Sequence, residues 1–229
     1  MSAKKWKSLE EEIVTCRACP RLVAWREKVA KTKRRAYREQ KYWGRPLPGF
    51  GDRGARLAIV GLAPGAHGAN RTGRMFTGDR SGEFLYAGLF RAGFASQPHS
   101  VHREDGLLLL DAFIVAPVRC APPDNLPTKE ELRRCAPFLD RELGLLSPRV
   151  LLALGGIAWS ASLEYFRRCS VALPRPLPKF GHGAVARLSG APSLVGCYHV
   201  SQQNTQTGRL TPAMFDAVMD QIKAELSRP

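Results

Sequence analysis

Short apolar runs recur along the chain and alternate with segments of helical periodicity. Four runs have the length and the unbroken apolar character of strands buried on both faces, and they cover residues 57–60, 107–115, 150–154 and 194–199. Helical patterns lie between and after them, at residues 82–92, 128–146, 156–167 and 211–226. Thr128 is the expected N-cap of the second helix, with Glu131 as its capping-box partner. This alternation predicts an α/β fold, in which a parallel sheet is covered on both faces and ligands bind at the carboxyl ends of the strands.

The segment before the first strand has a different pattern. Residues 5–26 are apolar at helical spacing but are interrupted at 16–20, which predicts a helix, a turn and a second helix. Residues 26–45, called the basic segment below, combine many Lys and Arg residues with Tyr37, Tyr42 and Trp43. Such a segment is either a solvated helix face or a surface that contacts phosphates. We expect one domain over residues 1–229, with residues 1–45 docked on it as an arm.

Composition narrows the class of partner. The chain has 229 residues, of which 44% are hydrophobic, enough for one substantial core. Its 35 Lys and Arg against 20 Asp and Glu give a net charge of +15, which favours a polyanionic partner. No secretory signal or bilayer-spanning run is evident, so we expect a cytoplasmic protein without membrane contact. Residues 174–193, rich in Pro and Gly, are expected to form a surface loop.

Four of the six cysteines form two distant pairs, Cys16 with Cys19 and Cys120 with Cys135. Two thiolates two residues apart converge on one metal centre from a single turn. The second pair is separated by fourteen residues, which suits the widely spaced ligand positions of an iron–sulfur cluster better than a zinc ion. Zinc, and four ordinary buried thiols, remain the alternatives. A disulfide framework is not expected in a reducing compartment.

The polar residues gather where the apolar runs end. A glycine-rich segment, G-L-A-P-G-A-H-G at 61–68, follows the first run and matches neither a dinucleotide loop nor a P-loop. Cys120 follows the second run, so the cysteines and this segment should be neighbours. His199 ends the fourth run, a place that favours function over a core role. The polar segment after it suits phosphates and base edges through Ser201, Gln202, Gln203, Asn204 and Arg209.

Four motifs together resemble the uracil-DNA glycosylase superfamily, and more narrowly its iron–sulfur branch, often called family five. They are G-L-A-P-G-A-H-G at 61–68, F-T-G-D at 76–79, R-C-A-P-P at 119–123 and H-V-S-Q-Q-N-T at 199–205. The resemblance implies a three-layer α/β/α sandwich around a four-stranded parallel sheet. It also implies a [4Fe-4S] cluster on the four paired cysteines and removal of damaged bases from DNA, leaving an abasic site.

The resemblance implies a role for each residue of the site. Such an enzyme swings the nucleotide out of the helix, and Phe76 would stack on the flipped base. Backbone amides at Gly61, Ala63 and Gly65 would read its carbonyl groups. His199 would stabilise the departing anion, and Asp79 would stabilise the sugar cation and orient the attacking water. Taken without the resemblance, Asp79 has an alternative interpretation as a turn residue or a helix N-cap.

The sequence departs from better-known relatives in two places. Residues 62–66 contain no ionisable side chain, so water activation falls to Asp79, with His67 and Asn125 as further candidates. Residues 116–117 are Ala-Pro where relatives devoted to uracil carry a base-reading Asn. The loss of that amide predicts relaxed specificity for uracil and other deaminated bases, hypoxanthine in particular.

Two other functional classes fit parts of this pattern. A non-catalytic iron–sulfur or zinc module could bind nucleic acid without turnover, and a zinc-containing nucleotide hydrolase would use the same cysteines. The leading hypothesis remains a monofunctional DNA glycosylase of base excision repair, monomeric and associated with the nucleoid when it acts. Its partner would be DNA that contains uracil or another deaminated base.

Overall fold

The computed structural model describes residues 2–228, and a six-stranded sheet of order β1-β3-β2-β4-β6-β5 lies at its centre. Its four inner strands are parallel: β2 (Leu57–Val60), β3 (Ala112–Val115), β4 (Val150–Leu154) and β6 (Ser193–Cys197). The edge strands β1 (Phe50–Gly51) and β5 (Val185–Ala186) pair antiparallel. The predicted α/β fold with four parallel strands is confirmed, and the mixed edges are an addition to it.

The differences from the predicted strands have local causes. The second predicted strand pairs only over Ala112–Val115, because Asp111 adopts a left-handed backbone with φ 51° and Leu109 instead bridges to Ala95. Leu108 and Leu110 on either side of that bridge are exposed. The strand β5 lies inside the stretch 174–193, for which the composition predicts loop throughout. A strand of two residues is too short to show any periodicity, so no pattern indicates it.

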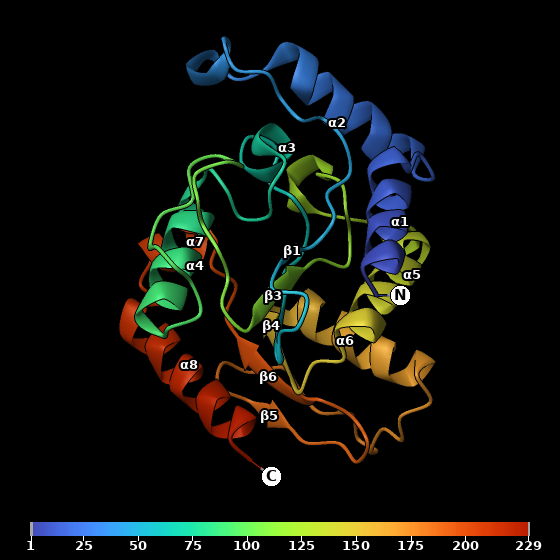
Figure 1. The fold of residues 1–229 in the computed structure, drawn as a ribbon, viewed down its shortest axis with the longest axis vertical. Coiled ribbons are helices and arrows are strands. Elements are labelled where there is room, and N and C mark those ends of the chain that lie inside the picture. The colour runs from blue at the N-terminus through green and yellow to red at the C-terminus, as the bar shows by residue number, and fades with distance from the viewer. Residues whose placement is uncertain (1, 229) are drawn as a thin grey trace.

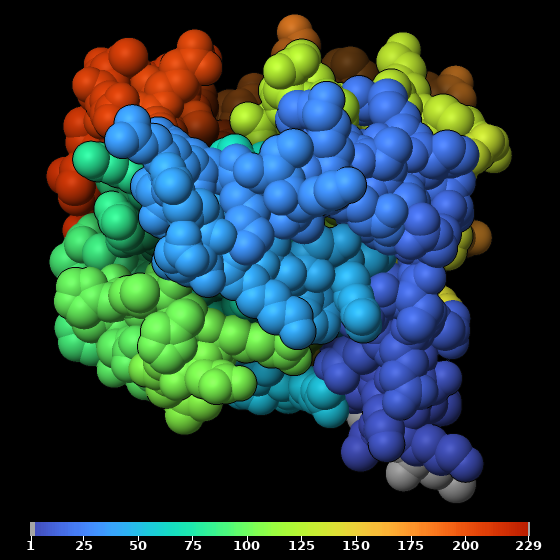
Figure 2. Space-filling view, turned by 90° about the horizontal axis from the view of Figure 1, so that it is seen from above, coloured from blue at the N-terminus to red at the C-terminus, as the bar shows by residue number. Residues whose placement is uncertain are grey.

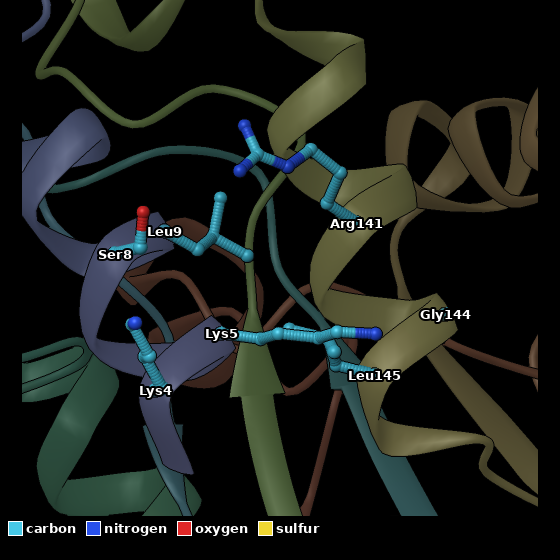
Figure 3. A pocket seen from close by; sticks show the side chains of 7 residues that line it. All are labelled: Lys4, Lys5, Ser8, Leu9, Arg141, Gly144 and Leu145. Carbon is cyan, nitrogen blue, oxygen red and sulfur yellow. The ribbon is translucent and has the colours of Figure 1, made fainter. Parts of the chain in front are cut away.

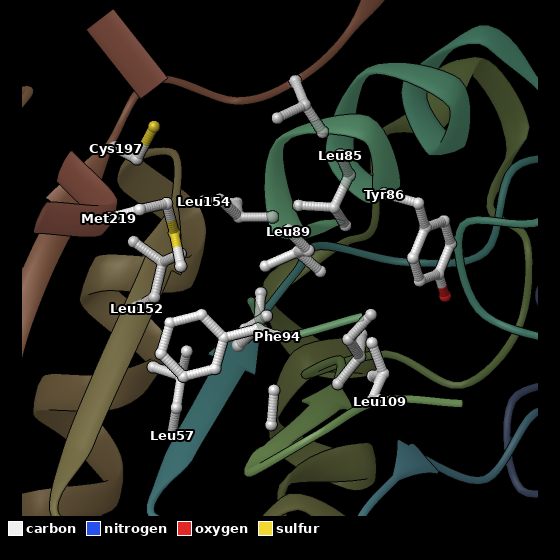
Figure 4. Packing of buried hydrophobic residues seen from close by; sticks show 14 of the residues in the cluster. Leu57, Leu85, Tyr86, Leu89, Phe94, Leu109, Leu152, Leu154, Cys197 and Met219 are labelled. Carbon is white, nitrogen blue, oxygen red and sulfur yellow. The ribbon is translucent and has the colours of Figure 1, made fainter. Parts of the chain in front are cut away.

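Helices cover both faces of the sheet (Figure 1). On one face lie α4 (Arg80–Arg91) and α8 (Pro212–Leu226), whose leucines and Phe215 belong to one buried core with Leu57 and Leu152. Figure 4 shows Leu85 and Leu89 of α4 and Met219 of α8 in this core. On the other face lie α1 (Ser2–Thr15), α5 (Lys129–Leu146) and α6 (Gly156–Arg168). Their apolar sides, including Trp6 and Trp159, bury the opposite surface of the same strands.

The predicted capping box at the start of α5 is confirmed. The Glu131 amide donates to Thr128 Oγ1 at 3.2 Å, and the Thr128 amide donates to Glu131 Oε2 at 2.8 Å. The helix–turn–helix predicted at the N-terminus is also present, as α1 followed by α2 (Pro20–Thr32) with the first cysteine pair at the turn.

Four short helices complete the chain, and no pattern in the sequence predicts them. They are the 3₁₀ helices η1 (Arg35–Tyr37) and η2 (Pro123–Asn125) and the α-helices α3 (Ala69–Thr72) and α7 (Gln202–Gln206). The helices α3 and α7 follow β2 and β6, so they mark the carboxyl edge of the sheet. Figure 2 looks onto the face above α2 and α3 and shows the basic segment lying across it, beside the red C-terminal region. Among residues 2–228, no helix combines the length and apolar character that crossing a bilayer requires.

Candidate functional site

Phe76 and His199 meet at the carboxyl edge of the sheet. Gly61 directly follows β2, and a Cβ on it would lie 3.0 Å from the Phe76 ring, so glycine permits the ring to rest on the backbone there. The centroids of the Phe76 and His199 rings are 6.4 Å apart, with their planes tilted by 39°. The structure thus brings together three residues that come from distant parts of the sequence.

Asp79 joins this group through the glycine-rich loop. Its Oδ2 lies where a side chain on Gly68 would point, because a Cβ there would come within 1.8 Å of that oxygen, and a Cβ on Gly65 within 3.0 Å. The Asp79 carboxylate therefore lies against this loop, whose residues 62–66 carry no ionisable side chain. The alternative interpretation of Asp79 as a helix N-cap is confirmed, since its Oδ1 accepts from the Gly82 amide at 3.0 Å. Its catalytic role remains a prediction.

Burial shapes the ionisation of both candidate catalytic groups. Burial raises the pKa of Asp79, while the amides of Gly82 and Ser81 and the charge of Arg71 lower it. Burial lowers the pKa of His199, so its imidazole is neutral near pH 7. A neutral imidazole still has one N–H to donate.

The His199 backbone is held in place by its neighbours. Asn204 Nδ2 donates to the His199 carbonyl at 2.8 Å, so the Asn204 side chain is directed at the protein. Gly155 lies under the ring, where a Cβ would approach the His199 Cβ at 3.3 Å. Of the other residues predicted to contact DNA, Gln202 and Gln203 are exposed, and the Arg209 guanidinium lies 4.9 Å from the centroid of the Tyr198 ring.

His67 and Asn125 have other surroundings. His67 Nδ1 lies 3.0 Å from the Tyr42 hydroxyl, which belongs to the basic segment, and burial lowers the pKa of His67. Asn125 is exposed in η2 with a left-handed backbone at φ 57°, as expected for a turn asparagine. Across residues 2–228, no hydrogen bond or ring contact joins either residue to Phe76 or His199.

Arg71 is a residue of this region that no motif of the sequence singles out. It is 8% exposed, and its guanidinium donates to the His67 carbonyl at 2.7 Å, the Gln40 side chain at 2.5 Å and the Gly78 carbonyl at 2.6 Å. It also lies 4.0 Å from the centroid of the Tyr37 ring. In the sequence it is one more basic residue, and no pattern distinguishes it from the solvated ones.

The four paired cysteines line one small pocket, together with Leu22, Arg26 and Arg119. Burial raises the pKa of Cys120 to about 11 and that of Cys135 to about 12. Cys19 and Cys120 also pack with Ala63 of the glycine-rich loop. This contact confirms the prediction that the cysteines and the loop are neighbours.

The residues around these thiols fit a negatively charged thiolate cluster. Arg26 Nη1 donates to Cys120 Sγ at 2.8 Å, but its buried Nε has no partner. The side-chain nitrogens of Arg119 likewise lack well-aligned hydrogen bonds, although its Nη2 lies 2.6 Å from Glu142 Oε2. Over residues 2–228, no three or more His, Cys, Asp or Glu side chains are grouped so as to hold a single metal ion. The cofactor therefore stays a prediction, which the buried cations and the thiol donor set support.

An open groove of about 560 Å³ lies between α1 and α5, away from these residues (Figure 3). Lys4, Lys5, Ser8 and Arg141 line part of it. Arg141 already pairs with Glu12 across the two helices. The groove contains none of the residues that the motifs predict, and we do not assign it to the site.

Comparison with known proteins identifies the same family as the sequence motifs do. The family model of the uracil DNA glycosylase superfamily matches residues 48–223. A type-5 uracil-DNA glycosylase of Mycobacterium tuberculosis is 56% identical over 92% of this chain and 78% of its own length. Proteins of the same name are 54% identical in Thermus thermophilus, over 93% of this chain and 94% of theirs, and 43% identical in Pyrobaculum aerophilum, over 93% and 90%.

Proposed function

The chain belongs to the uracil-DNA glycosylase superfamily, and from that premise we propose how its own side chains remove a base. It is a hydrolase of N-glycosyl bonds in DNA, and uracil is its substrate base. The observation that carries the mechanism is that Phe76 and Asp79 both lie against the glycine-rich loop, with His199 beside the Phe76 ring. A stacked base is out of reach of this edge, so the nucleotide is first extruded from the duplex.

Phe76 supplies the face on which the extruded base stacks. Its ring lies on Gly61, whose own amide donates to the Val115 carbonyl at 2.9 Å, so the prediction that this amide reads the base is wrong. The backbone amides of Ala63 and Gly65 read the carbonyl groups of uracil in this proposal. Because these groups are fixed before the base arrives, little ordering is needed when it binds. Phe76 therefore recognises the shape of the base, and the loop supplies the hydrogen bonds to it.

His199 and Asp79 act on the two halves of the breaking bond. The electron pair of the N-glycosidic bond leaves with the base, and the N–H of the neutral His199 stabilises the anion that results. The sugar becomes cationic, and the Asp79 carboxylate stabilises it. Water then adds to the anomeric carbon and gives its proton to Asp79.

The substrate range extends beyond uracil to other deaminated bases, hypoxanthine in particular. Ala116 follows β3 directly, is buried and has no side-chain amide with which to select one base. A buried amide would be left without a hydrogen-bond partner by the wrong base and would therefore reject it. Without that amide, discrimination between bases is weaker. Excision assays on duplexes with uracil, hypoxanthine, xanthine or mismatched thymine rank the substrates.

The four paired cysteines hold a [4Fe-4S] cluster in this proposal. Cys16 and Cys19 lie at the turn before α2, while Cys120 follows β3 and Cys135 lies in α5. When bound, the cluster joins these three segments by covalent iron–thiolate bonds, which is a structural role. Arg26, which donates to Cys120 Sγ, would offset part of its negative charge, whereas Arg119 already pairs with Glu142.

The basic segment is the proposed contact for the DNA backbone. Arg34, Arg35, Arg38 and Lys41 are exposed there, and the ion pairs among residues 2–228 involve none of them. Cations without a carboxylate partner are free to neutralise phosphates. We propose that the protein acts as a monomer on double-stranded DNA.

The mechanism is tested by Asp79→Ala on a uracil-containing duplex, with abasic sites cleaved by alkali. We expect excision at saturating enzyme to slow by about a hundredfold to ten-thousandfold while DNA affinity changes little. Asp216→Ala is the matched control, because Asp216 is a partly exposed acid on α8 that pairs with Arg91. Full activity of Asp79→Ala removes Asp79 from the mechanism, and turnover by the wild type excludes a mere binding module.

A further inference from the structure

The loop that carries Phe76 and Asp79 has a backbone that its own sequence does not favour. Phe76 has φ 51°, a left-handed conformation that is rare for a bulky residue. Such a conformation persists only when the surroundings fix it. The residues that hold this loop are therefore part of what presents Phe76 and Asp79.

The Gly78 amide donates to the Ser100 carbonyl at 2.9 Å, and two groups of arginine contacts add to this bond in holding the loop. One is internal and buried: Arg74 Nε donates to Thr77 Oγ1 at 2.9 Å, and its Nη2 pairs with Asp105 at 2.7 Å. The other comes through Arg71, whose Nη2 donates to the Gly78 carbonyl at 2.6 Å. Gly78 lies between Phe76 and Asp79 in the chain, so this bond acts on the loop itself.

Arg71 differs from Arg74 in what lies on its other side. It stacks on Tyr37 and donates to the exposed Gln40 of the basic segment, whereas Arg74 contacts residues of the body of the protein. A backbone hydrogen bond also joins Arg71 to the basic segment, since the Trp43 amide donates to the Arg71 carbonyl at 2.9 Å. Among the ion pairs of residues 2–228 none includes Arg71, although it is buried. Its uncompensated charge lowers the pKa of Asp79.

We propose that Arg71 is a positioning residue that links the basic segment to the loop of residues 76–79, so that DNA contact and base excision depend on one side chain. The inference rests on the roles proposed above for Phe76 and Asp79. DNA that engages the basic segment immobilises Tyr37 and Gln40. Both residues hold the guanidinium that fixes Gly78, so the loop is ordered when DNA is in place.

The first test compares Arg71→Met and Arg71→Lys with the wild type at saturating uracil duplex in single turnovers. Both variants lack the planar fork that donates to three oxygens, so we expect excision to slow by on the order of tenfold to a hundredfold. DNA affinity should change far less than the rate. The fluorescence of 2-aminopurine placed beside the uracil, which reports base extrusion, should show a smaller fraction of flipped base.

The pH dependence separates positioning from a general loss of structure. The groups that act on Asp79 are Arg71, the amides of Ser81 and Gly82, and Glu83, whose charge raises its pKa. Removal of the Arg71 charge raises the pKa of Asp79. The acidic limb of the plot of excision rate against pH should therefore move to higher pH in Arg71→Met. Arg71→Lys keeps a charge, and its limb should stay closer to that of the wild type.

Two further variants keep the test valid if the Arg71 variants fold poorly. Tyr37→Ala and Gln40→Ala lie on the surface segment, and each removes one contact to Arg71. We expect both to slow excision at saturating DNA, by about twofold to tenfold. Arg167→Ala is the matched control, because Arg167 is exposed on α6, pairs with Glu164 and has no contact to Arg71, and it should change neither DNA binding nor the saturated rate.

The outcomes distinguish this coupling from the mechanism beneath it. The coupling is refuted if three variants excise uracil at the wild-type rate at saturating DNA and the pH–rate profile of the first is unshifted: Arg71→Met, Tyr37→Ala and Gln40→Ala. The proposed mechanism would still hold in that case, provided that Asp79→Ala is inactive. An active Asp79→Ala would instead refute the mechanism, whatever the Arg71 variants do.

Discussion

The loop of residues 73–79 and the cysteine pocket are both buried and polar, but they differ in how many of their buried polar groups have hydrogen-bond partners in the protein. In the loop, Arg74 pairs with Asp105, Thr77 and Ser100, and Arg71 donates to three oxygens. In the cysteine pocket, by contrast, Arg26 Nε and the nitrogens of Arg119 lack well-aligned partners. Buried N–H groups without acceptors are costly.

The difference indicates what each region needs from outside. The loop is held by side chains of the protein itself, so its geometry should not depend on a bound cofactor. The cysteine pocket contains buried arginine N–H groups without aligned acceptors and four thiols, and burial raises the pKa of Cys120 and Cys135. An iron–sulfur cluster would supply acceptors and negative charge together. Variants in the two regions should therefore fail in different ways.

After that of Asp79→Ala, the largest expected effect falls at His199, which lies beside Phe76 of the loop. His199→Ala removes the N–H that stabilises the departing base, and we expect excision to slow by about a hundredfold to a thousandfold. Iron content and thermal stability should stay close to those of the wild type. His102→Ala, at an exposed histidine of the 99–106 loop, is the control and should be fully active. An equally active His199→Ala would leave anion stabilisation to the backbone amides.

A smaller effect is expected from Gly68→Ala. The new Cβ would meet Asp79 Oδ2 at 1.8 Å, so the carboxylate must move, and misplacement on this scale costs up to about a hundredfold in rate. DNA affinity should be retained.

Gly144→Ala provides the comparison for Gly68→Ala. Gly144 lies in α5 with open space around it, and alanine there should stabilise the fold by about 0.5–1 kcal/mol with unchanged excision. Thermal unfolding and single-turnover rates of both variants measure the contrast. Equal rates for both would mean that the position of Asp79 is not critical.

The sequence predicted those parts of the molecule that depend on local pattern. Unbroken apolar runs located β2 and β4 to the residue, and the T-x-x-E spacing located the cap of α5. The resemblance of the motifs named Phe76, Asp79 and His199 as one site. All three signals lie within short stretches of the chain.

The contacts made by tertiary packing were out of reach of the sequence. That Asp79 would fill the space over Gly68 depends on the fold of the chain between the two residues, and nothing in its composition fixes that fold. Arg71 is one charge among 35 Lys and Arg until its burial is known. His67 has the sequence position of a pocket residue, whereas its Nδ1 faces Tyr42.

The cysteine pocket should respond in stability and metal content more than in chemistry. Cys135→Ala removes one proposed ligand from α5, so we expect iron and visible absorbance to disappear. The melting temperature should fall by several degrees, since each kcal/mol shifts it by about 2–4 °C in chains of this size. Cys169→Ala is the control, at an exposed cysteine outside the pocket. Zinc in place of iron in the purified protein would contradict the cluster.

The smallest expected effect lies on the basic segment, which connects the two regions. Arg35→Ala combined with Arg38→Ala removes two exposed cations, and each phosphate that is no longer neutralised should reduce the slope of log K against log salt by about 0.9 on duplex DNA. Excision at saturating DNA should stay near the wild-type rate, because neither side chain contacts Arg71. The matched double variant is Arg133→Ala with Arg167→Ala, two exposed arginines already paired with Glu130 and Glu164. If both double variants have the wild-type slope, the basic segment is a solvated surface and the DNA backbone lies elsewhere.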